Sequence, residues 1–120
     1  MQLNKIKLTK ESSDRLKQLK AKTGLTPNIL SRIGFCLSLS DPTIPNPDDY
    51  PEEDREFNRY TLLGEWDALY VALLRQRIVA DKIGDDQREE DVFRAHINRG
   101  VMALSRQIKS IADLANLASA

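Results

Sequence analysis

The first residues of the chain alternate between apolar and polar side chains. Over residues 3–8, Ile6 and Leu8 fall on one side of an extended backbone, and Lys5 and Lys7 fall on the other. A period of two predicts a short β-strand with one buried face. We therefore expect Ile6 and Leu8 to pack against the helices that follow, and both lysines to face solvent.

A helix is predicted over residues 10–23. Thr9 can cap its first turn, because a threonine hydroxyl accepts a hydrogen bond from a free backbone amide there. Gly24 suits the left-handed conformation in which many helices end. The side chains expected to face the core are Ser12, Leu16 and Leu19, and those expected on an outward arc are Lys10, Lys17 and Lys20.

A second helix is predicted directly after the first. Thr26 is a suitable N-cap, and Pro27 occupies the first helical position, where a missing N–H has no cost. The body of this helix, residues 29–39, is apolar on nearly every side. A surface helix of a monomer has a single apolar stripe, so we expect this helix to be buried or shared with another subunit.

The next segment, from Ser40 to about Arg59, is predicted to be a loop. The prolines that interrupt regular structure there are Pro42, Pro45, Pro47 and Pro51. The acidic cluster between Asp48 and Glu56 could be imagined as a metal or acid–base site. Proline-rich surroundings give such a cluster little preorganisation, so we favour a solvated or partner-facing loop.

The C-terminal half predicts a pair of helices. The first spans residues 63–82 and ends at Gly84, and the second begins at a capping box formed by Asp86 and Glu89. The core-facing residues are Trp66, Leu69, Tyr70, Leu73 and Leu74 in the first helix, and Phe93, Ile97, Val101, Leu104, Ile108, Ile111 and Ala115 in the second. Steps of three and four along the second helix predict one long apolar stripe, which can coil against a partner helix.

The order of these elements places the chain in the mainly α class. Strand, helix, glycine turn and helix follow one another as in a ribbon-helix-helix unit, in which strands of two subunits pair and enter the major groove of DNA. We expect one domain over residues 1–120. It would comprise a basic strand-helix-helix unit (1–40), an acidic proline-rich loop (41–60) and the helical pair (61–120).

Charge is distributed unevenly along the chain. The 18 basic and 18 acidic side chains cancel, yet residues 1–39 hold eight basic and two acidic residues, and residues 40–58 hold one basic and seven acidic. The segment from Val92 onward is again basic. A basic N-terminal third is typical of proteins that contact phosphate backbones, and the free amides around Thr26 and Asn28 could hold one phosphate.

The candidate DNA-binding residues are therefore Lys5, Lys7, Lys10, Arg15, Lys17, Lys20 and Lys22. A simpler interpretation remains open for them. A lysine-rich helix face is commonly only a solvated face. Lysines on a strand can serve to protect an exposed edge from aggregation.

Other chemistry has little support in the sequence. There is no P-loop, no pair of cysteines, no Ser/His/Asp set and no glycine-rich dinucleotide turn. Cys36 lies in the apolar second helix without a neighbouring His or Lys, so we expect a buried structural thiol. His96 has no second ligand at metal-binding spacing. We expect no catalytic residue, metal or cofactor. Without a secretion signal or a membrane-spanning apolar run, we also expect a cytoplasmic protein.

Several strings in the sequence resemble the DndE family of DNA sulfur-modification proteins. Near the N-terminus these are Ile6-Lys7-Leu8-Thr9 and Leu16-Lys17-x-Leu19-Lys20-x-Lys22-Thr23-Gly24. The most specific is Arg32-x-Gly34-Phe35-Cys36-Leu37-Ser38-Leu39, which continues as Ser40-Asp41-Pro42-Thr43-Ile44-Pro45. Leu63-Gly64-Glu65-Trp66 and His96-x-x-Arg99-Gly100 follow later, so the resemblance covers nearly the whole chain.

The resemblance implies a role in bacterial phosphorothioation, in which sulfur replaces a non-bridging phosphate oxygen of DNA. It implies a DNA-binding accessory subunit, not an enzyme. Such a subunit binds double-stranded DNA, including nicked duplex, as a homo-oligomer (dimer or tetramer), and joins the other subunits of the modification complex. Its surface lysines would bind the DNA, and here the resemblance points to Lys5, Lys7, Lys17 and Lys20, with Lys22 and Arg15 beside them.

Two other functions fit parts of the same pattern. A ribbon-helix-helix transcriptional regulator would read one DNA sequence, but Asn4 alone on the strand is a poor set for reading bases. An assembly scaffold would use the apolar helices to join partners without touching DNA. Sequence preference would distinguish the regulator, and an absence of DNA binding at low salt would distinguish the scaffold.

Overall fold

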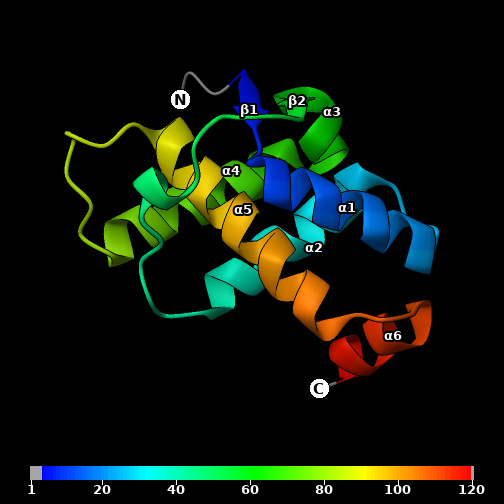
Figure 1. Ribbon diagram of the computed structural model, residues 1–120. Coiled ribbons are helices and arrows are strands. Elements are labelled where there is room, and N and C mark those ends of the chain that lie inside the picture. The colour runs from blue at the N-terminus through cyan, green and yellow to red at the C-terminus, as the bar shows by residue number, and fades with distance from the viewer. Residues whose placement is uncertain (1–3, 120) are drawn as a thin grey trace.

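The computed structural model describes residues 4–119, with side chains described up to residue 117, so Leu3 of the predicted strand lies outside the described residues. The described elements are β1 (Lys5–Lys7), α1 (Lys10–Thr23), α2 (Pro27–Ser40), a 3-10 turn (Pro47–Asp49), β2 (Glu56–Asn58), α3 (Arg59–Leu63), a second 3-10 turn (Gly64–Trp66), α4 (Asp67–Ala80), α5 (Glu89–Gln107) and α6 (Ile111–Ser119). Figure 1 shows their arrangement, which confirms the mainly α class.

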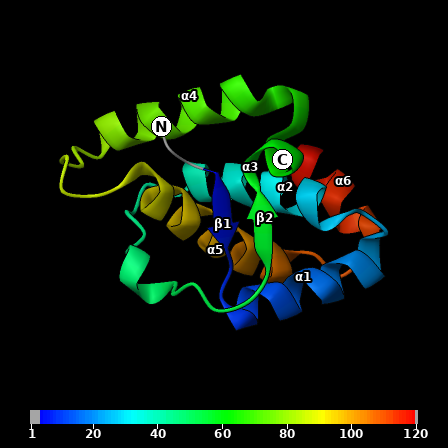
Figure 2. The ribbon, with the colours of Figure 1, turned by 90° about the horizontal axis from the view of Figure 1, so that it is seen from above.

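Helices α2 and α5 cross at the centre of the molecule. Seen from above, α4 runs along one side and α1 along the opposite side, with α2 and α5 between them (Figure 2). The crossing is very close, because a Cβ atom added at Gly100 would lie 1.7 Å from the carbonyl oxygen of Gly34. Only glycine at position 100 permits this approach of the two backbones. Phe35 of α2 and Phe93 of α5 pack beside it, with 5.0 Å between ring centroids.

The capping residues of α1 and α2 confirm the predicted starts of both helices. The Thr9 hydroxyl accepts a hydrogen bond from the Ser12 amide, and the Thr26 hydroxyl accepts one from the Ile29 amide. Helix α1 ends at Gly24 with φ of 76°, the left-handed conformation expected of it. The predicted inward residues Ser12, Leu16 and Leu19 are all buried.

Strand β1 pairs within its own chain. Its antiparallel partner is β2, with Ile6 opposite Phe57 and Lys7 opposite Glu56. Ile6 and Leu8 are buried, as predicted. A strand of the same chain thus pairs with β1, where we expected a strand of a second subunit, and the expectation of an unbroken loop through residue 59 was wrong. β2 is only three residues long and lies in an acidic, proline-rich context, so its pattern carried no strand signal.

Helix α2 is less enclosed than its composition suggested. Leu30, Ser31, Gly34, Phe35 and Ser38 are buried, which forms one face of the helix. Ile29 and Cys36 are exposed. The prediction that Cys36 is a buried thiol was therefore wrong, because position 36 falls on the face of α2 opposite α5.

The predicted C-terminal pair is divided more finely than expected. The helix predicted over 63–82 is broken at Gly64, whose φ of 58° is left-handed, and α4 then runs only to Ala80. Trp66 and Leu69 were predicted to face the core, but both are about half exposed. The break changes the rotation of the following helix, which moves these two side chains to the surface.

The long final helix also begins and ends differently from the prediction. It starts at Glu89 with Arg88 as its N-cap residue and without a side-chain cap, so the Asp86–Glu89 capping box was wrong. It ends at Gln107 instead of continuing to residue 115. The Asp113 carboxylate accepts hydrogen bonds from the amides of Lys109 and Ser110, which starts α6 as a separate helix.

Candidate nucleic-acid interface

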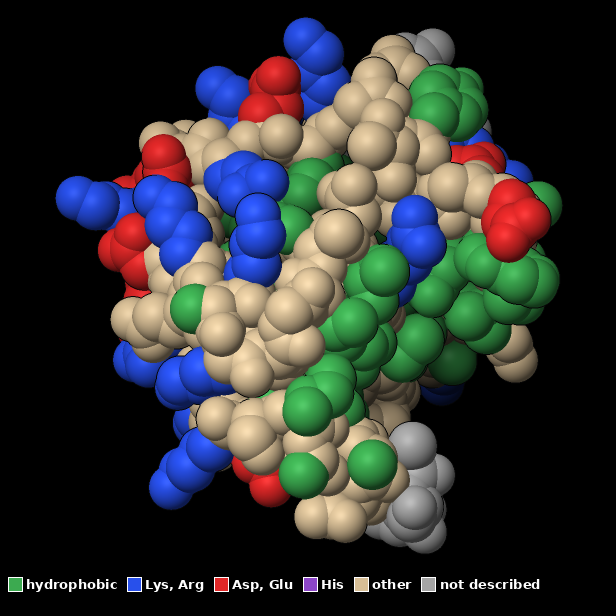
Figure 3. Space-filling view, turned by 90° about the vertical axis from the view of Figure 1, so that its right-hand side faces the viewer, with side chains coloured by type: hydrophobic (Ala, Val, Ile, Leu, Met, Phe, Trp, Pro, Cys, Tyr) green, Lys and Arg blue, Asp and Glu red, His purple; other side chains and the backbone are tan. Residues whose placement is uncertain are grey.

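All seven basic residues of the predicted DNA-binding set are exposed, and they lie on two adjoining elements. β1 carries Lys5 and Lys7 on its outward face, and α1 carries Lys10, Arg15, Lys17, Lys20 and Lys22. Figure 3 shows the molecule from the right-hand side of Figure 1. On this face, Lys and Arg side chains gather on the half toward α1, and hydrophobic side chains gather on the other half. The basic side of the molecule is therefore built by β1 and α1.

The five basic residues of α1 do not form a single row. At 100° per residue, Lys10, Lys17 and Lys20 lie along one flank of the helix, whereas Arg15 and Lys22 lie along the other. The exposed residues between the two flanks are Glu11, Asp14, Gln18 and Ala21. The fold thus brings Lys17 and Lys20 together one turn apart, and it separates them from Arg15 and Lys22.

Some of these basic residues form ion pairs with neighbouring acidic side chains. The ammonium of Lys5 lies 3.8 Å from a carboxylate oxygen of Glu56, and Arg15 lies 3.9 Å from Glu11. Within the described residues, no salt bridge involves Lys17, Lys20 or Lys22. Exposed pairs of this kind contribute little to stability, but a paired lysine is less available to a phosphate. Lys5 and Arg15 are therefore the less available members of the set, because Lys7 and Lys10 also form no salt bridge within the described residues.

The basic segment from Val92 onward divides into buried and exposed residues. Arg106 and Lys109, at the end of α5, are exposed. Arg94 and Arg99 instead point inward and bind parts of their own chain. The charge pattern alone could have suggested Arg106 and Lys109, because they belong to that basic segment, but it could not separate them from the two inward arginines.

Arg77 and Arg99 close the C-terminal end of α2. The Arg99 guanidinium donates to the Ser38 carbonyl at 2.8 Å and to the Thr43 carbonyl at 2.7 Å. The Arg77 guanidinium donates to the carbonyls of Leu39 and Asp41, at 2.9 and 2.8 Å, and forms a 2.7 Å ion pair with Asp81. A helix C-terminus presents free carbonyls with partial negative charge, which both cations satisfy. These two arginines, here called the arginine clamp, hold the loop after α2 in place.

His96 lies buried beside the clamp. Its Nδ1 atom is 2.7 Å from the Ser38 hydroxyl, and its Nε2 atom has no hydrogen-bond partner among the described residues. Burial and then the nearby charge of Arg99 lower the pKa of His96 to about 4. A serine beside a histidine can suggest a nucleophile and its base, but both side chains are closed off from solvent. Within residues 4–119 there is no cluster of potential metal ligands around it or elsewhere.

Cys36 is exposed, yet it is not an activated thiol. Partial burial raises its pKa, and a hydrogen bond with Tyr70 only partly opposes this effect. The thiolate is the reactive form of cysteine, so a raised pKa disfavours reaction. The side chain carries no observation that would make it a sulfur carrier.

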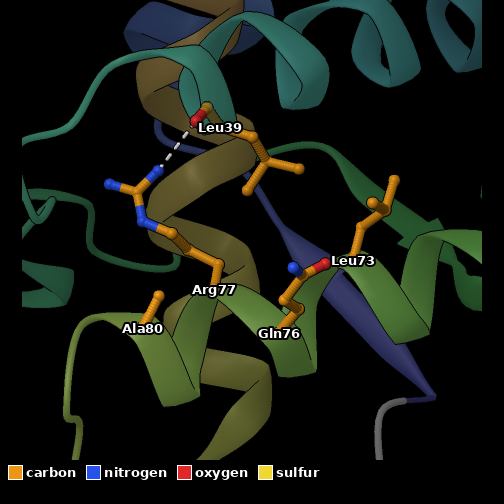
Figure 4. Close-up of a pocket in the computed structure, with 5 residues that line it drawn as sticks. All are labelled: Leu39, Leu73, Gln76, Arg77 and Ala80. Carbon is orange, nitrogen blue, oxygen red and sulfur yellow. Dashed lines mark hydrogen bonds between the residues drawn. The ribbon is translucent and has the colours of Figure 1, made fainter.

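A small hollow lies between the end of α2 and α4 (Figure 4). Its volume is about 230 Å³, and it is lined by Leu39, Leu73, Gln76, Arg77 and Ala80. The Arg77 guanidinium turns toward the Leu39 carbonyl and so is occupied by the clamp. The remaining lining is largely aliphatic, so the hollow can accept an apolar side chain but offers no group for acid–base chemistry. None of the helices within residues 4–119 is both long enough and apolar enough to cross a membrane.

Comparison with known proteins gives a consistent result. Residues 5–112 match the family model described as DNA sulphur modification protein DndE. The structure is similar to the crystal structure of DndE from Escherichia coli B7A, involved in DNA phosphorothioation modification. The TM-score is 0.70 and the identity 28%, over 87% of this chain and 98% of that one.

A second similar structure is that of a glycine-to-lysine double mutant of DndE involved in DNA phosphorothioation. Its TM-score is 0.68 and its identity 25%, over 87% of this chain and 99% of that one. No curated protein sequence gives a significant match. The family match covers most of the chain and agrees with the fold, so this protein belongs to the DndE family of DNA sulfur-modification proteins.

Proposed function

We propose that this protein is a DNA-binding accessory subunit of the bacterial DNA phosphorothioate modification system. In the cytoplasm it would bind duplex DNA, including nicked duplex, and hold it for the other subunits of the complex. The observation that carries the proposal is the exposed basic side of α1 in a chain of this family, where Lys17 and Lys20 lie one turn apart and form no salt bridge within the described residues.

The arrangement of the charges supports contact with the phosphate backbone. Lysine ammonium groups on a helix surface attract phosphates without distinguishing bases, and each contact releases counterions from the DNA. The basic surface presents few amide side chains that could read adenine, since Asn4 and Gln18 are the exposed amides nearest to it in sequence. We therefore propose binding that depends strongly on salt and weakly on sequence.

An accessory role without catalysis is supported by the state of the candidate reactive groups. Ser38 and His96 are buried together, and the thiol of Cys36 has a raised pKa. Catalysis needs a reactive group that substrate can reach in its reactive protonation state. We accordingly propose that other subunits supply the sulfur chemistry, and that this subunit uses no metal or cofactor of its own.

Assembly with other chains is supported by the apolar side of the molecule. The large exposed hydrophobic side chains of the described residues include Ile29 on α2, Trp66, Leu69 and Val79 on or beside α4, and Ile111 on α6. Figure 3 shows hydrophobic side chains gathered on the side away from α1. Contiguous apolar surface is typical of protein contacts. We propose that this side mediates the homo-oligomer, a dimer or tetramer, and contact with partner subunits.

The same apolar surface favours one alternative function, a scaffold that assembles the complex without binding DNA. The ribbon-helix-helix regulator is less well supported, because β1 pairs with β2 of its own chain and Glu56 stands opposite Lys7. A regulator would prefer one palindromic sequence by a large factor over random duplex. Binding of random and palindromic duplexes with equal affinity would be inconsistent with it.

The experiment that tests the proposal is a DNA-binding titration with charge reversal on α1. We expect Lys17→Glu with Lys20→Glu to abolish binding to a fluorescent nicked duplex at low salt, because both residues would then repel phosphates. The matched control is Lys82→Glu with Arg88→Glu, an equal charge change on exposed residues between α4 and α5. Equal binding by the two variants would reject the proposed surface, and no binding by the unmodified protein would favour the scaffold.

A further inference from the structure

An acidic segment crosses the basic side of the molecule. We define the acidic strap as residues Asp48–Glu56. Its acidic side chains, all exposed, are Asp48, Asp49, Glu52, Glu53, Asp54 and Glu56. Arg55 is its only basic residue. The strap thus carries a strong negative charge next to the elements that carry the positive charge.

The strap is held firmly against the rest of the protein. The Arg94 guanidinium, itself largely buried, donates to the Tyr50 carbonyl at 2.8 Å and lies 3.3 Å from the Glu52 carboxylate. The same guanidinium forms a 2.7 Å ion pair with Asp91 of its own helix. A cation fixed by both a carbonyl and a carboxylate cannot easily release the segment. The exposed acidic side chains therefore project from a fixed backbone.

The strap also binds directly to Leu8, the residue after β1. The amides of Glu53 and Asp54 donate to the Leu8 carbonyl at 3.2 and 2.9 Å, and the Leu8 amide donates to the Arg55 carbonyl at 2.8 Å. The Arg55 amide continues this series of contacts with a 3.1 Å hydrogen bond to the Ser13 hydroxyl of α1. These bonds fix the position of the strap relative to the lysines.

Two of its carboxylates lie against β1 and against the first turn of α1. Glu56 stands opposite Lys7 in the sheet and pairs with Lys5 at 3.8 Å. The Glu53 carboxylate accepts a hydrogen bond from the Lys10 amide at 3.4 Å, in the first turn of α1. A free first turn attracts phosphate, but here a carboxylate of the same chain already occupies it.

We propose that the acidic strap excludes DNA from β1 and from the first turn of α1, and so confines the DNA contact to the second half of α1, around Lys17, Lys20 and Lys22. This inference rests on the proposed DNA binding. Electrostatic effects between exposed charges extend over about 8 Å at physiological salt, so the carboxylates of the strap act on Lys5, Lys7 and Lys10 but only weakly at longer range. Although exposed and basic, Lys5 and Lys7 contribute little to binding in the unmodified protein.

The test combines removal of the strap charge with removal of the β1 lysines in the full chain. The variant Glu53→Gln with Glu56→Gln neutralises the carboxylates that contact the Lys10 amide and the Lys5 ammonium, and it keeps the shape and one acceptor oxygen of each side chain. Asp85→Asn with Asp86→Asn is the matched control, with the same charge change in the loop between α4 and α5, which lies away from α1 in Figures 1 and 2. Each protein is titrated with a fluorescent duplex over a range of salt, and its folding is checked by thermal melting.

We expect Lys5→Ala with Lys7→Ala to change the affinity of the unmodified protein by less than about twofold, since less than one full phosphate contact is then lost. The strap variant should bind more tightly than both the unmodified protein and the control. Lys5 and Lys7 should then add two phosphate contacts. Between about 50 and 200 mM salt, the affinity of the strap variant should therefore fall by a further factor on the order of ten compared with the unmodified protein. Adding the β1 alanines to the strap variant should remove this gain.

Two results would overturn the inference. One is a loss of affinity from the β1 alanines in the unmodified protein as large as that from Lys17→Ala with Lys20→Ala. The other is a gain in affinity of the strap variant that is no larger than that of the Asp85/Asp86 control. This result would mean that the gain comes from the change in net charge alone. Absence of DNA binding by every variant would instead reject the proposed function, and the strap inference would be rejected with it.

Discussion

Two groups of basic residues in this protein differ in exposure and in what they bind. On α1, Lys17 and Lys20 are exposed and form no salt bridge within the described residues. On α4 and α5, the side chains of Arg77 and Arg99 are only 10% and 13% exposed, and they bind backbone carbonyls. Positive charge in the sequence therefore serves the proposed DNA contact in one region and the internal structure in the other.

The difference matches the chemistry of the two side chains. Arginine has a planar group with several fixed donors, which suits several carbonyls at the end of a helix. Lysine carries a compact, strongly hydrated charge on a flexible chain, which suits phosphates at variable positions. A count of basic residues alone does not distinguish the two regions. We expect removal of the arginines to lower stability, and removal of the α1 lysines to lower DNA binding.

The largest expected effect comes from the helix crossing on which both regions depend. Gly100→Ala would place a methyl group 1.7 Å from the Gly34 carbonyl oxygen, so α2 and α5 must move apart. We expect a loss of at least about 4 kcal/mol in the free energy of unfolding, measured by chemical denaturation, with loss of DNA binding. Gly84→Ala is the control, because its methyl group would meet only the flexible side chain of Asp86. Similar stability of the two variants would contradict the close crossing.

The next effect distinguishes the clamp from the proposed DNA-binding surface. Arg99→Ala should lower the free energy of unfolding by about 3 kcal/mol, because it leaves the carbonyls of Ser38 and Thr43 without this donor. Lys17→Ala should change it by no more than about 0.5 kcal/mol, since it removes only an exposed side chain. Denaturation at neutral pH measures both. Equal losses would mean that the two regions do not differ as the structure indicates.

The pH dependence of stability tests the burial of His96 beside the clamp. Since the folded pKa of His96 is lowered from 6.5 to about 4, the unfolded chain binds the proton more readily. Stability from this group is present above pH 6.5 and is lost as the pH falls toward 4, by up to about 3 kcal/mol. His96→Gln should remove this part of the pH profile. The lowered pKa values of Asp41 and Asp67 act in the same direction, but below their usual value of 3.8.

Features set by local sequence could be predicted well. Thr9, Gly24, Thr26 and Pro27 act within one or two turns of their own helix, so their effects do not depend on the rest of the fold. The exposure of the lysines on α1 was predictable for the same reason. A helical period places a lysine on the surface whenever its apolar neighbours define the buried side.

Features set by distant contacts could not be predicted. β2 is a strand only because β1 pairs with it across about fifty residues of chain, and this pairing also places Glu56 beside Lys5. The inward turn of Arg94 and Arg99 depends on carbonyls in the proline-rich segment, which α5 meets only in the folded protein. The candidate surface was thus located from sequence, but the acidic strap across it required the structure.

The most direct test of DNA backbone binding by α1 is the salt dependence of duplex binding. For Lys17→Ala with Lys20→Ala, the slope of log affinity against log salt should become less steep by about 2, because about 0.9 is lost for each phosphate contact. Lys82→Ala, an exposed lysine after α4, should leave the slope unchanged. An unchanged slope in the α1 variant, with its fold intact, would contradict the account.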